Sequence, residues 1–550
     1  MGIPSYFSYI AKNHTDIIQK LCKFEKNIDN LYLDSNSIIY DCLRAISDEY
    51  SKCKNDIEFE TMLNLAVCKK IDEYILHLQP QKKVFIAFDG VAPVAKLEQQ
   101  RNRRYKSNLL SQIRNSIEND ETVIWNKTAI TPGTRFMVNL NLFIQKYYNK
   151  KEKQFGIEEF IISGSDECGE GEHKLFQYIR DNSSYHHRTV TVIYGLDADL
   201  IMLTLNHLDI APNMYLYRET PEFIKTIDNN LEANKNYLID IPLFGKYLNI
   251  EFNGNLGNNL NKKQLVNRIK DYVFICFLLG NDFLPHFPAI NIRSKGIEHL
   301  INAYKKVCIK DEFSLIDKNN VLVWKNIREL LKVLAANEHN NICQEYYIRR
   351  KMEKTPYRNL DSKSNGPTTE DKLMSIPIRK RQVEEFINPY ENGWRERYYI
   401  KLFDTRINIE REKEICINYL EGLEWTWKYY SGDCIDWRWS YKYHYPPLLN
   451  DLIKYIPYFD TSLFKKAINN FGPVSPYVQL SYVLPRASLD LLPPKLFEKL
   501  LSSHSDLYEG NHEFVWAFCR YFWEAHIKLP HIDIKNMDDF VTKNLSTFVL

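Results

Sequence analysis

The sequence contains no CxxC pair, although it has 11 cysteines. This absence argues against a zinc ribbon and against a disulfide framework, and scattered cysteines are typical of a reducing compartment. The amino-terminal stretch lacks the basic start and apolar core of a signal peptide. No apolar run reaches the roughly 18 to 20 residues needed to cross a bilayer. We therefore expect an intracellular protein without a membrane segment, in the cytoplasm or, alternatively, in the nucleus.

The chain also lacks a strong overall charge, since its formal net charge is only +2. A polyanionic ligand would have to be met by local basic patches and not by a general positive field. The chain of 550 residues is too long for one ordinary core, while 44% hydrophobic and 26% charged residues are normal for a globular protein. No internal repeat or coiled-coil pattern is present.

Short apolar runs that end in acidic residues alternate with helix-compatible segments in the first half of the chain. The pattern predicts a first helix at about residues 5–23 and buried strands that end at Asp34, Asp89, Gly164 and Asp197. An irregular, Asn-rich insertion is expected from Asn229 to Asn261, and a linker or mobile loop from Lys351 to Lys372. Such alternation predicts a mostly parallel sheet covered by helices on both faces, with ligands at the carboxyl ends of its strands.

Seven carboxylates stand at the ends of predicted strands or in turns next to Gly, Asn or Ser. For each one alone, a role as a helix cap or turn former is favoured over a functional role by about three to one. Together they would repel one another in a buried site unless divalent cations were present. Oxygen ligands without paired His or Cys favour Mg²⁺ or Mn²⁺, and a set of this size predicts two ions that activate a water for phosphodiester hydrolysis. The seven are Asp34, Asp89, Glu170, Glu172, Asp197, Asp199 and Asp282.

A basic segment follows Asp89 after a turn at Gly90 and Pro93. On a helix its side chains at i, i+4, i+7 and i+8 project from one face, namely Lys96, Gln100, Arg103 and Arg104. A basic run is commonly a solvated face, and alone this explanation and phosphate binding are about equally good. The direct link to Asp89 favours a phosphate site beside a metal site.

Aromatic residues are dense in the last third of the chain. Core packing is the simpler explanation for most of them. Trp437 and Trp439, on either side of Arg438, could instead stack on nucleic-acid bases. His173 and His286 could each touch phosphate, but a hydrogen-bonded structural role is the simpler interpretation.

Ordered sequence blocks resemble the Xrn family of 5′-to-3′ exoribonucleases along nearly the whole chain. They include Leu31-Tyr-Leu-Asp-Ser-Asn36, Asp89-Gly-Val-Ala-Pro93, Gly169-Glu-Gly-Glu-His-Lys174, Tyr194-Gly-Leu-Asp-Ala-Asp-Leu-Ile201 and Gly280-Asn-Asp-Phe-Leu-Pro-His286. Each block alone is a weak signal, but their number and order make chance implausible. The block at Tyr521 to His531 is similar to the end of the family's second conserved region, so the resemblance implies a compact member without a long C-terminal extension.

The resemblance implies specific roles for the residues in these blocks. The seven carboxylates would form the metal site of a PIN/flap-nuclease-like domain, and the four residues of the basic helix would bind a 5′-monophosphate. Tyr40, where the family usually has His, would stack on a terminal base together with Trp439 or, less favoured, Trp437. Asn36 would contact the substrate, and Ser37 replaces a customary Gly.

We therefore predict an α/β nuclease domain at residues 1–305, a helical connection and linker at 306–375, and a mainly helical second conserved region at 376–550. The predicted activity is processive 5′-to-3′ degradation of 5′-monophosphorylated single-stranded RNA to nucleoside 5′-monophosphates in mRNA decay. The resemblance implies a monomer that works with the decapping machinery. The alternatives are a structure-specific DNA flap nuclease and a catalytically altered RNA-binding scaffold. The flap nuclease is disfavoured because the segment from Ile290 to Ile297 lacks the first Gly of a Gly-Ile-Gly hairpin.

Overall fold

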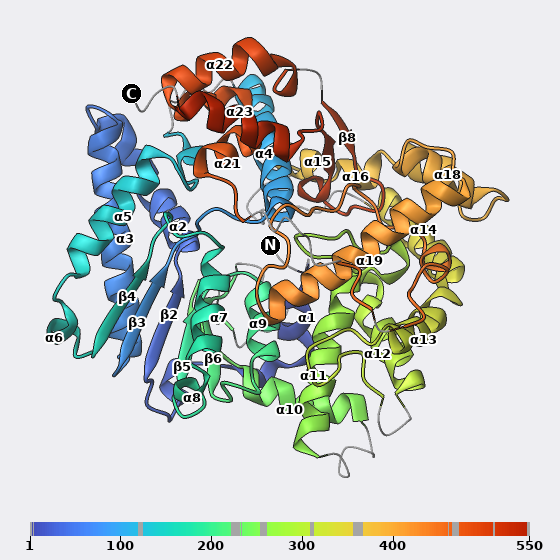
Figure 1. Ribbon diagram of the computed structural model, residues 1–550, viewed down its shortest axis with the longest axis horizontal. Coiled ribbons are helices and arrows are strands. Elements are labelled where there is room, and N and C mark those ends of the chain that lie inside the picture. The colour runs from blue at the N-terminus through green and yellow to red at the C-terminus, as the bar shows by residue number, and fades with distance from the viewer. Residues whose placement is uncertain are drawn as a thin grey trace.

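A twisted sheet with parallel central strands lies at one end of the molecule in the computed structural model (Figure 1). The structure describes residues 3, 5–118, 125–221, 231–232, 234–253, 261–308, 313–355, 367–459, 461–464, 472–509 and 512–546. The strand order is β1 (Ile18–Gln19), β7 (Asn236–Asp240), β6 (Met214–Glu219), β5 (Thr191–Tyr194), β2 (Asn30–Asp34), β3 (Lys83–Ala87) and β4 (Glu159–Ser163). Strands β2 to β6 pair in parallel, whereas β7 pairs antiparallel with both β6 and β1.

Side chains alternate between the two faces of the sheet, and both faces are buried. Leu31 and Leu33 of β2 pack with α2 (Asn36–Ile46), α3 (Asp56–Leu78) and α5 (Arg135–Tyr148). Tyr32 faces the opposite side, towards α7 (Gly171–Asp181), α9 (Asp199–Asn206) and α11 (Lys262–Cys276). The predicted α/β class with a mostly parallel sheet and helices on both faces is confirmed.

Helix α4 (Val94–Glu118) leaves the sheet and enters the carboxyl-terminal part of the molecule. In Figure 1 it stands between the group α21 (Pro476–Val483), α22 (Pro494–His504) and α23 (Ile534–Ser546) and the hairpin of β8 (Glu513–Val515) and β9 (His526–Lys528). Val94 and Leu97 at its start share a buried cluster with α21 to α23. The basic helix expected after Asp89 is therefore present, and it is packed by segments about 400 residues away along the chain.

The remaining helices pack beside the sheet. They include α10 (Ile241–Asn253), α12 (Gly296–Val307), α13 (Trp324–Ala335), α14 (Glu338–Lys354), α15 (Thr369–Met374), α17 (Gln382–Ile387), α18 (Trp394–Leu402) and the long α19 (Ile409–Ser431). One hydrophobic cluster joins the sheet to these helices, from Ile3 to Phe518. The helical character expected for the carboxyl-terminal region is confirmed. No helix within the described ranges is both long enough and apolar enough to span a membrane.

Three local predictions differ from the structure. The first helix, α1, covers only Tyr6–Asn13, because the chain then turns to place Ile18 and Gln19 as an edge strand beside β7. The Asn-rich insertion contains β7 and α10, although residues 222–230, 233 and 254–260 lie outside the described residues. The start of the expected linker is helical, since α14 extends to Lys354, and residues 356–366 lie outside the described part.

Candidate metal and phosphate site

The carboxyl ends of β2 and β3 bring Asp34 and Asp89 together. Asp34 pairs in register with Ala87, and Asp89 follows Ala87 by two residues. The start of α7 closes over both. A Cβ atom on Gly171 would lie only 2.8 Å from Oδ1 of Asp34, so a larger residue could not occupy this position without a shift. The backbone N–H of Gly171 donates a 2.7 Å hydrogen bond to Oδ1 of Asp89. This close approach places Glu170 and Glu172 beside the two aspartates.

Asn36 at the start of α2 holds Asp89 by two reciprocal hydrogen bonds. The Asp89 N–H donates to Oδ1 of Asn36 at 3.1 Å, and the Asn36 side-chain amide donates back to Oδ2 of Asp89. Asn36 therefore orients a carboxylate in the structure, which is a positioning role beside the substrate contact implied by the resemblance. Ser37, the departure from the family pattern, donates to the Asp34 carbonyl at 3.4 Å.

Lys96 on α4 places its ammonium inside the acidic cluster. Its Nζ lies 2.7 Å from Oδ2 of Asp282 and also pairs with Glu170. Burial would lower the pKa of Lys96, but Asp282 and Glu170 raise it well above its ordinary value. Burial would likewise raise the pKa of Asp282, but Lys96 holds it below its ordinary value. Tyr429 of α19 donates a 2.9 Å hydrogen bond to the other carboxylate oxygen of Glu170.

Glu172 and Asp199 are acids whose ionised forms the described residues do not fully compensate. Oε2 of Glu172 and Oδ1 of Asp199 are buried, and neither has a hydrogen-bond partner in the described part of the chain. Burial and the neighbouring Asp199 raise the pKa of Glu172 well above its ordinary value. Burial and Asp282 raise the pKa of Asp199 to about 7. These two oxygens are the type of ligand that Mg²⁺ or Mn²⁺ prefers.

The remaining acids lie close enough to the others for their charges to shift the pKa of neighbouring carboxyl groups. Burial, Asp89 and then Asp197 raise the pKa of Asp34. Asp197 and Asp282 line one cavity next to this site. The structure thus gathers all seven carboxylates predicted from the sequence, from five separate segments of the chain.

His173 joins the cluster, although the sequence favoured a structural role for it. One ligand atom each from Glu170, Glu172 and His173 lie within 4.8 Å of one another. The imidazole stacks on Tyr429 with ring centroids 3.7 Å apart, and burial lowers its pKa well below the ordinary value. A neutral imidazole can bind a metal ion. In the sequence, the sign of this role is that His173 directly follows Glu172. One adjacent acid does not distinguish a metal ligand from a structural histidine.

The other residues of the predicted phosphate face lie farther along α4. Gln100 is buried, Arg104 is half-buried and Arg103 is exposed and lines the cavity. Oε1 of Gln100 and Nη1 of Arg104 are buried without hydrogen-bond partners among the described residues. Burial lowers the pKa of Arg104 to about 10, while the nearby Tyr40 acts in the opposite direction. Tyr40 and Arg104 thus lie close together. The buried polar atoms of Gln100 and Arg104 are available to bind a ligand.

The two candidate tryptophans differ in their surroundings. Trp439 is buried and stacks on Trp425, with centroids 5.4 Å apart and an interplanar angle of 24°. Trp437 is half-buried, and its carbonyl accepts a 3.0 Å hydrogen bond from the backbone N–H of Val94 at the start of α4. Trp437 has the more exposed side chain, but it is Trp439 that belongs to the residues lining the cavity beside the acidic cluster.

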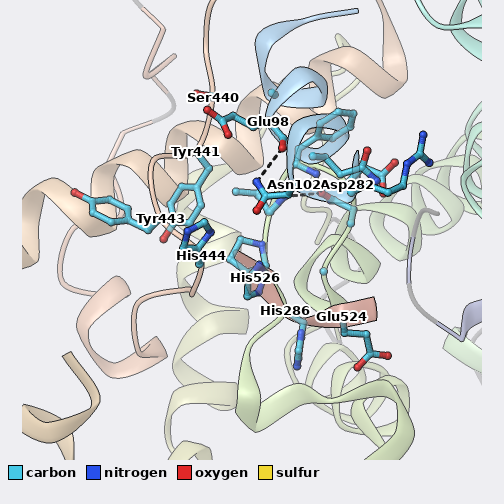
Figure 2. A pocket seen from close by; sticks show the side chains of 18 of the residues that line it. Glu98, Asn102, Asp282, His286, Ser440, Tyr441, Tyr443, His444, Glu524 and His526 are labelled. Carbon is cyan, nitrogen blue, oxygen red and sulfur yellow. Dashed lines mark hydrogen bonds between the residues drawn. The ribbon is translucent and has the colours of Figure 1, made fainter. Parts of the chain in front are cut away.

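A cavity of about 2490 Å³ opens beside the acidic cluster. Figure 2 shows Asp282 in its wall with Asn102 and Glu98 of α4, and His286, His444 and His526 nearby. The carboxyl-terminal region fixes this wall: Arg101 donates to the Pro530 carbonyl at 2.8 Å. The cavity is much larger than the 300–1,000 Å³ typical of small-molecule pockets, so it can hold a polymer segment.

Comparison with known proteins identifies the family. The family model described as XRN 5′-3′ exonuclease N-terminus matches residues 1–220, and the model described as Xrn1 helical domain matches residues 262–385 and 378–546. The chain is similar to 5′-3′ exoribonuclease 1 of Saccharomyces cerevisiae, with 26% identity over 98% of this chain and 43% of the yeast protein. It is also similar to 5′-3′ exoribonuclease 2 of Arabidopsis thaliana, with 26% identity over 98% of this chain and 66% of the relative.

Human 5′-3′ exoribonuclease 1 is 27% identical over 98% of this chain and 34% of the human protein. The chain thus spans less than two thirds of the length of these relatives. One helical-domain model alone covers more than half of the chain, and the amino-terminal model covers the sheet that carries the acidic cluster. The chain therefore belongs to the XRN family of 5′-3′ exonucleases.

Proposed function

We propose that this protein is a 5′-to-3′ exoribonuclease that hydrolyses 5′-monophosphorylated single-stranded RNA and releases nucleoside 5′-monophosphates. The observation that carries the proposal is the position of the acidic cluster directly against α4, which bears Lys96, Arg103 and Arg104. A site for phosphodiester hydrolysis thus adjoins a face that suits a terminal phosphate. The relatives, which are named 5′-3′ exoribonucleases, support this choice.

The cluster suits two Mg²⁺ ions, or Mn²⁺, since all seven predicted ligands offer oxygen and two of their oxygens are buried without a partner in the described residues. The residues that would hold the ions are Asp34, Asp89, Glu170, Glu172, Asp197, Asp199 and Asp282. When bound, such ions supply an activated water and stabilise the charge that develops on the leaving oxygen. Asn36 and Gly171 keep Asp89 in a fixed orientation through hydrogen bonds.

The polar atoms of Gln100 and Arg104 would bind the 5′-monophosphate, with Arg103 at the cavity side and Lys96 at the border with the acids. We expect a triphosphate or a cap to be refused, because it is too large and too charged for a pocket built around one phosphate. Tyr40, beside Arg104, would stack on a terminal base together with Trp439, which lines the cavity, and Trp437 is the alternative. Decapping leaves a 5′-monophosphate, so decapping enzymes are the partners whose product this site would accept.

Labelled RNA tests the direction and the product. We expect a 5′-monophosphorylated RNA with a radioactive 5′-phosphate to release labelled mononucleotide first, while the same RNA labelled at its 3′ end shortens without early release of label. Early release of 3′-terminal label would refute 5′-to-3′ polarity. Preferential cutting of a DNA flap over single-stranded RNA would support the DNA flap nuclease instead.

A further inference from the structure

Two stacked aromatic rings lie in the cavity wall, in a segment that the proposed function does not use. The ring centroids of Tyr521 and Trp523 are 4.2 Å apart with an interplanar angle of 16°. Both residues line the cavity that also contains Asp197 and Asp282. Trp523 is 42% exposed, which is unusual for a tryptophan and places one large ring surface in contact with solvent.

Core packing explains the residue between them but not the pair itself. Phe522 is buried and packs against Phe514, with ring centroids 5.1 Å apart. Phe522 therefore anchors this short segment, and its two aromatic neighbours are not needed for that purpose. A stacked Tyr–Trp pair that remains partly exposed provides a flat surface that a planar ligand can extend.

Two arginines flank this pair. The guanidinium carbons of Arg293 and Arg520 each lie 5.5 Å from the ring centroid of Tyr521. Oε1 of Glu524 accepts a 2.6 Å hydrogen bond from the Arg293 guanidinium, and Oε2 accepts a 2.7 Å hydrogen bond from the Arg520 backbone N–H. Glu524 thus holds the side chain of Arg293 and the backbone at Arg520. Stacked aromatic rings with adjacent cations are the combination that binds bases and phosphates of single-stranded nucleic acid without sequence preference.

The pair is also attached to α4. Nζ of Lys106 donates hydrogen bonds of 2.7 Å to the carbonyl oxygens of both Trp523 and Ala525. The helix that bears the proposed phosphate site therefore fixes the aromatic pair in position. Figure 2 shows side chains of Asp282 and Glu524 around the same pocket, so a strand could follow one continuous cavity between the two regions.

We propose that Tyr521 and Trp523, with Arg293 and Arg520, form a second RNA-binding subsite for nucleotides downstream of the 5′ end. This inference rests on the proposed function, because it takes single-stranded RNA as the ligand of the cavity. The subsite binds any base, since every base offers a flat π surface. Its contribution is to retain the shortened strand after each nucleotide is released.

Binding of RNA to the full-length protein tests the subsite independently of hydrolysis. Fluorescence anisotropy in EDTA measures the affinity for a 5′-monophosphorylated RNA of about twelve nucleotides, within the site sizes of single-strand binders. We expect Trp523→Ala to weaken binding by about 5- to 100-fold, the usual cost of losing one base–aromatic stack. Trp523→Phe should retain most of the affinity, and Phe459→Ala, which removes a 79% exposed ring outside the cavity, should leave it unchanged.

Hydrolysis kinetics provide the second measurement. With Mg²⁺, Trp523→Ala should raise KM for the longer RNA by a similar factor, while kcat and the KM for a 5′-phosphorylated dinucleotide stay the same. Unchanged affinity for the longer RNA, or an equal loss on both lengths, would overturn the subsite. A wild-type protein that hydrolyses neither RNA would refute the proposed function, and the anisotropy result would still decide the subsite.

Discussion

The ammonium of Lys96 lies 2.7 Å from the carboxylate of Asp282, although 186 residues separate them in the chain. The same ammonium contacts Glu170, so one cation from α4 meets carboxylates from two other segments. This contact links the acidic cluster to the basic helix. It also means that Lys96 offsets part of the negative charge of the cluster in the metal-free protein.

Replacing this lysine should destabilise the metal-free protein. Lys96→Met leaves Asp282 and Glu170 buried without their cation, and loss of one partner of a buried ion pair typically lowers the free energy of unfolding by about 3–5 kcal/mol. Denaturant unfolding in EDTA measures the change. Mg²⁺ should recover part of it, because a divalent cation can neutralise the same carboxylates. Lys20→Met, which breaks the exposed pair with Glu232, is the control and should have no measurable effect. Equal stability of Lys96→Met and the wild type in EDTA would contradict this role.

Glu172 should be essential for hydrolysis and dispensable for RNA binding. Glu172→Gln keeps the shape of the side chain but removes the charge that a metal ion needs, so we expect turnover to fall by more than the roughly 10- to 100-fold typical of residues that only support a ligand. Single-turnover rates and anisotropy measure the two properties. Glu298→Gln, on the exposed surface of α12, should behave like the wild type. Retained turnover in Glu172→Gln would remove Glu172 from the metal site.

Asn36 should act through Asp89. Asn36→Ala removes both hydrogen bonds that orient this carboxylate, and we expect the Mg²⁺ concentration for half-maximal activity to rise about 10- to 100-fold. Saturating Mg²⁺ should restore much of the rate, which a general folding defect would not allow. Asn13→Ala at the end of α1 serves as the comparison. A normal Mg²⁺ requirement with a raised KM for RNA would show instead that Asn36 mainly contacts substrate.

The pH dependence of stability should report on Asp199. Its pKa rises from 3.8 to about 7 on folding, so between these values the folded protein binds more protons than the unfolded chain. In EDTA the free energy of unfolding should therefore fall as the pH rises from about 4 to 7. Asp199→Asn has no such group and should show a smaller fall. Parallel profiles for the two proteins would contradict the raised pKa. The stabilisation by Mg²⁺ should increase over the same range, because the metal binds the deprotonated carboxylates.

The sequence predicted the central strands and the acids at their ends because both signals are local. A short apolar run followed by Asp34 or Asp89 is visible within ten residues. Strands β6 and β7 were not predicted. The second of them lies in an Asn-rich segment, where pairing with β6 and β1 decides the conformation and local propensity does not.

The contacts that complete the site depend on distant parts of the chain. Sequence spacing placed Lys96 on the same helical face as Gln100 and Arg104, but it could not show that Asp282 would meet its ammonium. Likewise, only the tertiary structure shows that Trp439 stacks on Trp425 and lines the cavity. Local patterns thus predicted which residues are candidates, and long-range packing decided their partners.

The most direct test of the proposed function compares three RNAs that differ only at the 5′ end. With Mg²⁺, an RNA with a 5′-monophosphate should be degraded much faster than the same RNA with a 5′-hydroxyl or a 5′-triphosphate. EDTA should abolish degradation of all three. Equal rates on the three ends would contradict the assignment of Gln100, Arg103 and Arg104 to the terminal phosphate, and unchanged rates in EDTA would contradict the metal site.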